Sequence, residues 1–177
     1  MKLNLGSNNT RYQGFLNVDI RDITGVDIVE DVTVLASIPD GAVDEIIAHN
    51  ILEHIAPDRT AQVLSLWFKK LKLGGWIQIG VPDGELIFSR HLNGRVTRRA
   101  YKTRPWGNVI HSIFGNMGIL RKMHGDDAER YMHHTLFCES FLRRSMESAG
   151  FGDIIRVRPN HRDNVTLRGW KRTVVAL

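Results

Sequence analysis

Polar residues that suit nucleoside binding follow three strand-like stretches near the start of the chain. The first stretch ends in Gly6-Ser7-Asn8, the second in Asp19-Ile20 and the third in Asp31-Val32. A glycine lets the backbone pass close to a ligand, because it carries no Cβ atom. A carboxylate on the neighbouring strand can accept hydrogen bonds from both hydroxyls of a ribose, and a second carboxylate can accept one from the exocyclic amine of a purine. The three ends together predict a nucleoside site.

Strand-like and helix-like patterns alternate along most of the chain. Two apolar stripes with helical spacing predict one helix from Pro57 to the glycine pair Gly74-Gly75 and another over Cys138–Ala149. Strands are predicted at Lys2–Gly6, Phe15–Ile20, Val26–Glu30, Ala42–Asn50, Trp76–Val81, Gly152–Val157 and Val165–Leu177, the last interrupted by Gly169. This alternation favours a mostly parallel sheet covered on both faces. The link from Ser7 to Gly14 is short for a parallel crossover, so we expect either an irregular turn there or shorter strands.

Composition favours one globular domain over residues 1–177. Hydrophobic residues make up 42% of the chain and charged residues 24%, which argues against a disordered chain. The single cysteine, Cys138, excludes an intrachain disulfide framework and fits a reducing compartment, so we expect a cytoplasmic protein. The sequence contains no apolar run of the ~18 residues that a spanning helix needs, and we expect no membrane span.

The excess positive charge lies in residues 84–135. This segment holds nine Lys and Arg against four Asp and Glu, while the rest of the chain is balanced. It does not continue the alternation of strand-like and helix-like patterns, which predicts an insertion after the fifth strand. Loops at that end of the strands hold ligands in doubly wound sheets. We expect it to roof the site and to attract an anionic partner. The alternative is a solvated surface excursion in which Trp106 and Phe114 form a satellite core.

Further motifs complete a pattern that is known from one enzyme family. Leu52-Glu53-His54 follows the fourth predicted strand, Leu71-Lys72-Leu73-Gly74-Gly75 precedes the fifth, and Val81-Pro82-Asp83 ends it. With the opening Leu3-Asn4-Leu5-Gly6-Ser7 and the later Asn17-Val18-Asp19-Ile20, the chain resembles the class I S-adenosylmethionine-dependent methyltransferases over nearly its whole length. The resemblance implies a Rossmann-like, doubly wound, mostly parallel seven-stranded sheet with helices on both faces and a final antiparallel strand.

The resemblance also implies S-adenosyl-L-methionine as cofactor, bound across the first four strands. The residues that it assigns are Gly6, Ser7 and Asn8 for the amino-acid part, Asp19 with Ile20 for the ribose, Asp31 and Val32 for the adenine, and His49 and Asn50 near the sulfonium. Asn8 departs from the family, which usually has a glycine there. Asparagine tolerates the same left-handed dihedral angles, but its side chain takes up space.

Methyl transfer needs the acceptor in line with the methyl group, and positioning can supply most of the acceleration. An oxygen or nitrogen acceptor can also use a general base with a pKa near the working pH. The candidates are Asp83, His54 and the neighbouring pair His133 and His134. The eight histidines show no spacing such as HExxH, so we expect no metal.

The acceptor stays open at this point. We expect a small or glycan-like acceptor, with the basic segment favouring an anionic one. A nucleic-acid acceptor is less favoured, because Ala48-His49-Asn50-Ile51 lacks the Asn/Asp-Pro-Pro-aromatic motif of base-amine methyltransferases. A third interpretation is a non-catalytic scaffold, for which Asn8 is the main support. The absence of G-x-G-x-x-G argues against an NAD-dependent dehydrogenase.

Overall fold

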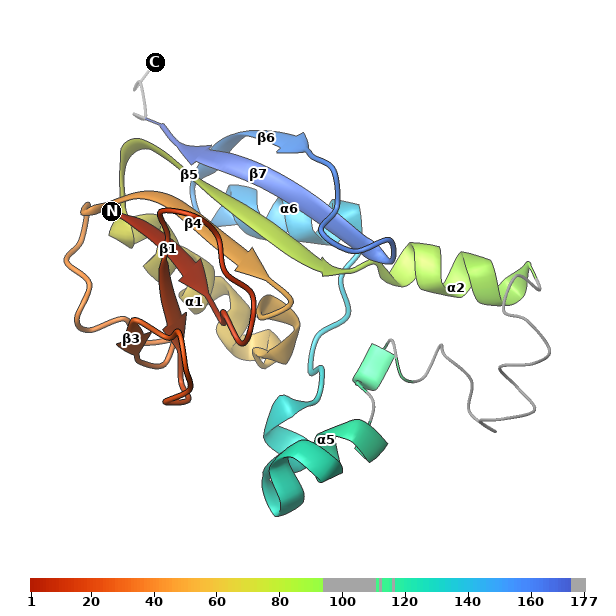
Figure 1. The fold of residues 1–177 in the computed structure, drawn as a ribbon. Helices are drawn as coiled ribbons and strands as arrows, with labels where there is room; N and C mark the ends of the chain where they lie inside the picture. Colours follow the sequence, from red (N-terminus) through yellow and green to blue (C-terminus); the bar gives the residue numbers. More distant parts are fainter. Residues whose placement is uncertain (94–110, 112, 116, 173–177) are drawn as a thin grey trace.

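A seven-stranded sheet forms the centre of the computed structural model, which describes residues 1–93, 111, 113–115 and 117–172 (Figure 1). The strand order is β3-β2-β1-β4-β5-β7-β6. Only β7 runs against its neighbours. The strands are β1 (Lys2–Leu5), β2 (Leu16–Asp19), β3 (Ile28–Val29), β4 (Val43–His49), β5 (Leu71–Pro82), β6 (Phe151–Arg156) and β7 (Asn164–Lys171). The expected mostly parallel sheet with a final antiparallel strand is confirmed.

Two helices, α1 (Pro57–Lys70) and α6 (Glu139–Ser148), pack against each other on one face of the sheet (Figure 1). In the described part of the chain no helix lies over the opposite face, so the expectation of helices on both faces holds for one face only. The reason is the length of the links. Residues 6–15 and 20–27 join the first three strands by turns, because they are too short for crossover helices.

The core lies between the sheet and these two helices. Apolar residues that alternate along β4 and β5 point to this face and are fully buried, as are the inward residues of α1 and α6. The group includes Ile46, Ile77, Ile79, Leu64, Trp67, Leu142 and Met146. Their burial fixes the register of the central strands, because a slip by one residue would turn each of these side chains to the other face.

Glycines account for two differences between the observed helices and strands and those expected from the sequence. The first helix ends at Lys70, before the glycine pair, and Gly74-Gly75 lies inside β5 at an irregularity in its pairing with β4. Gly74 has a φ of +81°, which favours glycine. Gly169 does not interrupt β7: it pairs with Ile77, and a Cβ there would lie 3.0 Å from the Met146 side chain.

The expected insertion is described in part. It contains α2 (Gly84–Leu92), α5 (Met117–His124) and the 3-10 helix η2 (Gly125–Tyr131), while residues 94–110, with Tyr101 and Trp106, lie outside the described residues. Its last residues return to η1 (Leu52–His54), where the amides of His134 and Thr135 both donate to the Glu53 carbonyl. A roof over the site stays a prediction. None of the described helices has the length and apolarity to cross a bilayer.

Trp67 provides a test of how α1 is held against the β3 end of the sheet. Its side chain is fully buried, and its Nε1 donates to the Val32 carbonyl at 2.9 Å. Trp67→Phe removes the donor and leaves a small cavity, so we expect a loss of roughly 2–4 kcal/mol in urea denaturation. Trp170→Phe, on the helix-free face, should cost about 1 kcal/mol or less. Equal losses would contradict this assignment.

Candidate functional site

The ends of β1 and β2 are joined by hydrogen bonds from the turn that follows β1. The Ser7 amide donates to the Val18 carbonyl at 3.1 Å, and the Asn8 amide donates to Asp19 Oδ2 at 2.8 Å. Asn8 has a φ of +44°, the left-handed conformation expected for it. The amide of Glu30 donates to the Asp19 carbonyl at 2.9 Å, which brings in the end of β3. The structure thus brings the three predicted strand ends together.

The Asp19 carboxylate already accepts four hydrogen bonds. Oδ1 accepts from the Arg21 amide and Nε, and Oδ2 accepts from the Asn8 amide and Arg21 Nη2, at 2.8–3.3 Å. Burial raises the pKa of Asp19, but the hydrogen bonds from Arg21 and Asn8 outweigh it, so the pKa is lowered. The group is therefore a buried, charged and fully satisfied acceptor. A ribose can reach it only if the Arg21 side chain, a quarter exposed, moves away.

Gly6 and Ser7 have different surroundings at the start of the same turn. A Cβ at Gly6 would lie 2.8 Å from the side chain of Ile51, so packing against Ile51 requires the glycine. The Ser7 hydroxyl is buried, and the described part of the chain offers it no hydrogen-bond partner. A buried hydroxyl in that state is a candidate to bind a ligand.

At the end of β3 the backbone turns through Asp31 and Val32. Asp31 Oδ1 accepts from the Thr33 amide at 2.8 Å, which stabilises the turn, and its side chain stays partly exposed. Val32 is buried and its carbonyl is held by Trp67. Both residues lie where the sequence places them, at the strand end next to Asp19. Ile20, which follows Asp19, is exposed.

His49 lies at the end of β4 in a chain of side-chain hydrogen bonds. Arg168 Nη2 donates to Gln78 Oε1, Gln78 Nε2 contacts His49 Nε2 at 3.0 Å, and the Tyr12 hydroxyl contacts His49 Nδ1 at 2.9 Å. Because Arg168 fixes the orientation of the Gln78 amide, its NH₂ group must donate to His49 Nε2. His49 then carries its proton on Nδ1 and donates to Tyr12. Burial lowers the pKa of His49 to about 4, so the ring is neutral near pH 7.

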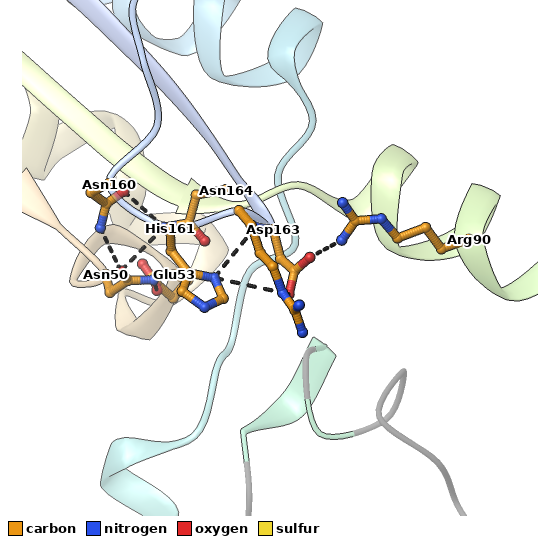
Figure 2. A network of polar contacts seen from close by, with 8 residues as sticks. Asn50, Glu53, Arg90, Asn160, His161, Asp163 and Asn164 are labelled. Carbon is orange, nitrogen blue, oxygen red and sulfur yellow. Dashed lines mark hydrogen bonds and ion pairs between the residues drawn. The ribbon is translucent and has the colours of Figure 1, made fainter. Parts of the chain in front are cut away.

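Asn50 connects the end of β4 to the loop between β6 and β7. Its Nδ2 donates to Glu53 Oε1 at 3.0 Å, and its Oδ1 accepts from the Nδ2 atoms of Asn160 and Asn164 (Figure 2). The backbone of Asn50 has a φ of +55°, a strained conformation that these contacts hold in place. These contacts join two distant parts of the chain at the end of β4. We call the group of Asn50, Glu53, Asn160 and Asn164 the polar corner.

Three basic side chains surround one carboxylate on the far side of this loop. Asp163 forms ion pairs with Arg90 of α2 and with Arg162, and His161 Nδ1 lies 3.9 Å from its Oδ2 (Figure 2). The Asp163 carbonyl also accepts from the Asp83 amide at 2.8 Å. The loop is thereby fixed to the start of α2, with cationic groups in excess over the single carboxylate.

The predicted general bases have different surroundings. Asp83 is buried and caps α2, since its Oδ1 accepts from the Leu86 amide at 3.2 Å. His54 Nδ1 lies 3.0 Å from the Met132 carbonyl, and its pKa is lowered to about 4 by burial and then by His133. The side chain of His134 is exposed. Asp83 thus has a structural task, and the two histidines belong to the corner around η1.

Glu53, beside the predicted bases His54 and His133, was not itself predicted to take part in chemistry. Glu53 is 1% exposed, and burial raises its pKa to about 7. The rings of His54 and His133 meet edge to face with their centroids 4.9 Å apart. Glu53 stands in the Leu52-Glu53-His54 motif and could have been singled out from it. His133, one of the predicted bases, comes from the insertion, and no local pattern predicts that it meets His54 of η1.

An open, mainly apolar pocket of about 480 Å³ lies between α2 and the start of α6. It begins at Gly84, directly after Asp83, and its walls include Phe88, Leu136 and Phe141. This pocket does not include any of the residues predicted to bind the cofactor.

The sequence matches no family model and no curated protein. Solved structures match over nearly the whole chain, among them a SAM-dependent methyltransferase from Archaeoglobus fulgidus at 15% identity, with a TM-score of 0.57, covering 96% of this chain and 85% of that one. The chain has the class I methyltransferase fold. A possible histamine N-methyltransferase from Thermotoga maritima matches at 14% identity and a TM-score of 0.61, covering 97% and 81%.

A third match of this fold was solved with ligands. It is the 1,6-didemethyltoxoflavin-N1-methyltransferase of Burkholderia thailandensis, with bound 1,6-didemethyltoxoflavin and S-adenosylhomocysteine. The identity is 15% and the TM-score 0.58, and the match covers 97% of this chain and 70% of that one. The TM-scores therefore confirm the expected fold, and identities this low say nothing of the acceptor.

The neutral state of His49 predicts a pH effect on stability. Its pKa is about 4 in the folded chain, against an ordinary value of 6.5. Between these values the unfolded chain binds more protons, so His49 lowers stability as the pH falls from 6.5 towards 4. His49→Gln lacks this group. We expect the stability of the variant relative to wild type to rise by on the order of 2–3 kcal/mol from pH 7 to pH 4 in urea denaturation.

The control for this effect is His91→Gln, which alters an exposed histidine on α2. Its stability should follow that of the wild type at both pH values. The same relative gain in both variants would show that the effect is not specific to His49.

Proposed function

We propose that this chain is an S-adenosylmethionine-dependent methyltransferase that modifies an oxygen or nitrogen of a small or glycan-like acceptor. The observation that carries the proposal is the Asp19 carboxylate, charged and held by the Asn8 amide where the ends of β1 and β2 meet. A carboxylate in that place is the group that binds a ribose in nucleotide-binding sheets. The fold shared with known methyltransferases supports the same assignment.

The residues at this edge fit the cofactor on one condition. Asp19 would hold the ribose once Arg21 has moved, and the buried Ser7 hydroxyl would gain the partner that the described chain does not give it. Asp31 and Val32 would hold the adenine, with Ile20 beside the ribose. Gly6 and Asn8 would line the amino-acid part, and His49 and Asn50 the region of the sulfonium. When bound, the cofactor supplies an electrophilic methyl group.

The chain's own residues would then position the acceptor. Asn50, fixed by Asn160 and Asn164, provides a rigid corner, and rigidity of this kind favours near-attack geometry. Arg90 and Arg162 around Asp163 leave a net positive charge in the same loop, which supports an anionic acceptor. His134 is the exposed one among the predicted bases and is the one we propose to face the acceptor. The unpaired Cys138 fits a reducing compartment such as the cytoplasm.

A second function is favoured by one observation. Because Arg21 and Asn8 already satisfy Asp19, the same structure could serve as a non-catalytic scaffold that binds no cofactor. The nucleic-acid alternative draws its support from the basic segment, where Tyr101 and Trp106 stand between arginines and could stack on bases, and these two residues lie outside the described residues. The two experiments below separate a cofactor-binding chain from a scaffold.

The first experiment is calorimetric titration of the full chain with S-adenosylmethionine and S-adenosylhomocysteine. Asp19→Ala should weaken both by roughly ten- to a hundredfold, because it removes a charged acceptor worth ~1.5–3 kcal/mol. Asp22→Ala removes an exposed carboxylate three positions further on and should leave the affinity unchanged. Absence of heat at millimolar cofactor, or equal affinities for wild type and Asp19→Ala, would contradict the proposal.

The second experiment tests whether Arg21 competes with the ribose. Arg21→Ala frees two lone-pair directions on Asp19, so we expect binding to tighten by roughly two- to fivefold, the size of a partly exposed ion pair of about 0.5–1 kcal/mol. The same calorimetry measures it. Weaker binding by Arg21→Ala would show that Arg21 helps to bind the cofactor and would refute the competition.

A further inference from the structure

Three side chains of metal-ligand type converge beside the polar corner at the end of β4. They are Glu53 and His54 of η1 and His133 of the segment that follows η2, and each offers one ligand atom within 4.8 Å of the others. Two of them are adjacent in sequence, and the third arrives from the insertion. None of the three is among the residues proposed to bind the cofactor, although Glu53 contacts Asn50, which is one of them.

Glu53 is the part of this cluster that most needs a partner. Its carboxylate is fully buried, and although Oε1 accepts from Asn50 Nδ2, Oε2 has no hydrogen-bond partner in the described part of the chain. A buried carboxylate oxygen without a donor is costly. A cation at this point would compensate that cost.

His54 is oriented as a metal ligand is. A carbonyl oxygen can only accept, so His54 Nδ1 must carry the hydrogen that is shared with the Met132 carbonyl at 3.0 Å. The lone pair of the neutral ring is then on Nε2. Histidines that bind metals usually donate their other ring N–H in this way to a carbonyl or carboxylate, which fixes both the tautomer and the direction of the ring.

The backbone that carries His133 is held on both sides. The His133 amide donates to the Phe114 carbonyl at 3.2 Å, the His134 amide donates to the Glu53 carbonyl at 2.7 Å, and the Thr135 hydroxyl donates to the Ile55 carbonyl at 2.9 Å. His133 therefore meets His54 at a place set by the backbone. The backbone hydrogen bonds on either side of His133 thus bring its side chain to η1.

We propose that Glu53, His54 and His133 form a binding site for a divalent transition-metal ion, with Zn²⁺ as the best match. Two imidazoles and one carboxylate are a ligand set that zinc accepts, with a fourth position left for water or another ligand. Tetrahedral bonds of about 2.0–2.2 Å require the ligand atoms to lie closer together than the 4.8 Å within which they now fall, so the side chains must move inward when the ion binds. The ion would clamp the segment after η2 onto η1. This inference does not depend on cofactor binding.

The test is calorimetric titration of Zn²⁺ into the full chain after removal of metals with EDTA, without cofactor. We expect one equivalent to bind, and we expect Glu53→Gln and His133→Ala each to weaken it at least tenfold. His134→Ala alters the neighbouring exposed histidine and should keep the wild-type affinity. Absence of a stoichiometric site, or equal weakening by His134→Ala and His133→Ala, would overturn the proposal.

A second readout keeps the test valid if a variant fails to fold. Imidazole ¹H–¹⁵N spectra of the wild-type chain should show Zn²⁺-dependent shifts of the His54 and His133 ring signals at one equivalent, with His91 unchanged. Shifts confined to His91, His134 or His161 would assign the ion to another place and refute the site.

Discussion

The carboxylate of Asp19 is the contact on which the functional edge of this molecule depends. It accepts one hydrogen bond from the amide of Asn8, in the turn after β1, and three from Arg21. The backbone carbonyl of Asp19 accepts a further one from the amide of Glu30, at the end of β3. One residue thus joins three strand ends. Because the group is buried and charged, it keeps these donors close to it. An adenosyl ligand would use the same carboxylate oxygens. The Arg21 side chain and the ribose of the ligand would therefore compete for Asp19.

A second constraint comes from the short links between the first strands. They leave one sheet face without a helix in the part of the chain that the structure describes, and polar side chains pair across it. Arg168, Gln78, His49 and Tyr12 form one directed series of hydrogen bonds, and the Arg168 guanidinium lies 4.1 Å from the centroid of the Trp76 ring. These contacts replace the apolar cover that a crossover helix would give, while burial lowers the pKa of His49 and keeps its ring neutral.

How much could be predicted from the sequence depended on how local each feature is. Strand ends such as Asp19 and Asp31 were located from alternation and turn residues, and Asn8 adopted the expected conformation. Gly74-Gly75 was misinterpreted as a helix stop, because a strand irregularity uses the same residues. The pairing of Arg21 with Asp19 depends on the rotamer that Arg21 adopts in the turn after β2. The contact of His133 with Glu53 depends on how the insertion folds back. No sequence periodicity encodes either contact.

The most direct test of the central claim is a ¹H–¹⁵N amide spectrum of the full chain, recorded while S-adenosylhomocysteine is added. We expect the shifts to cluster at the three strand ends, on the amides of residues 6–8, 19–21 and 31–33, and at residues 49–50 at the end of β4. Absence of shifts at saturating ligand, or shifts gathered at the apolar pocket between α2 and α6, would contradict it.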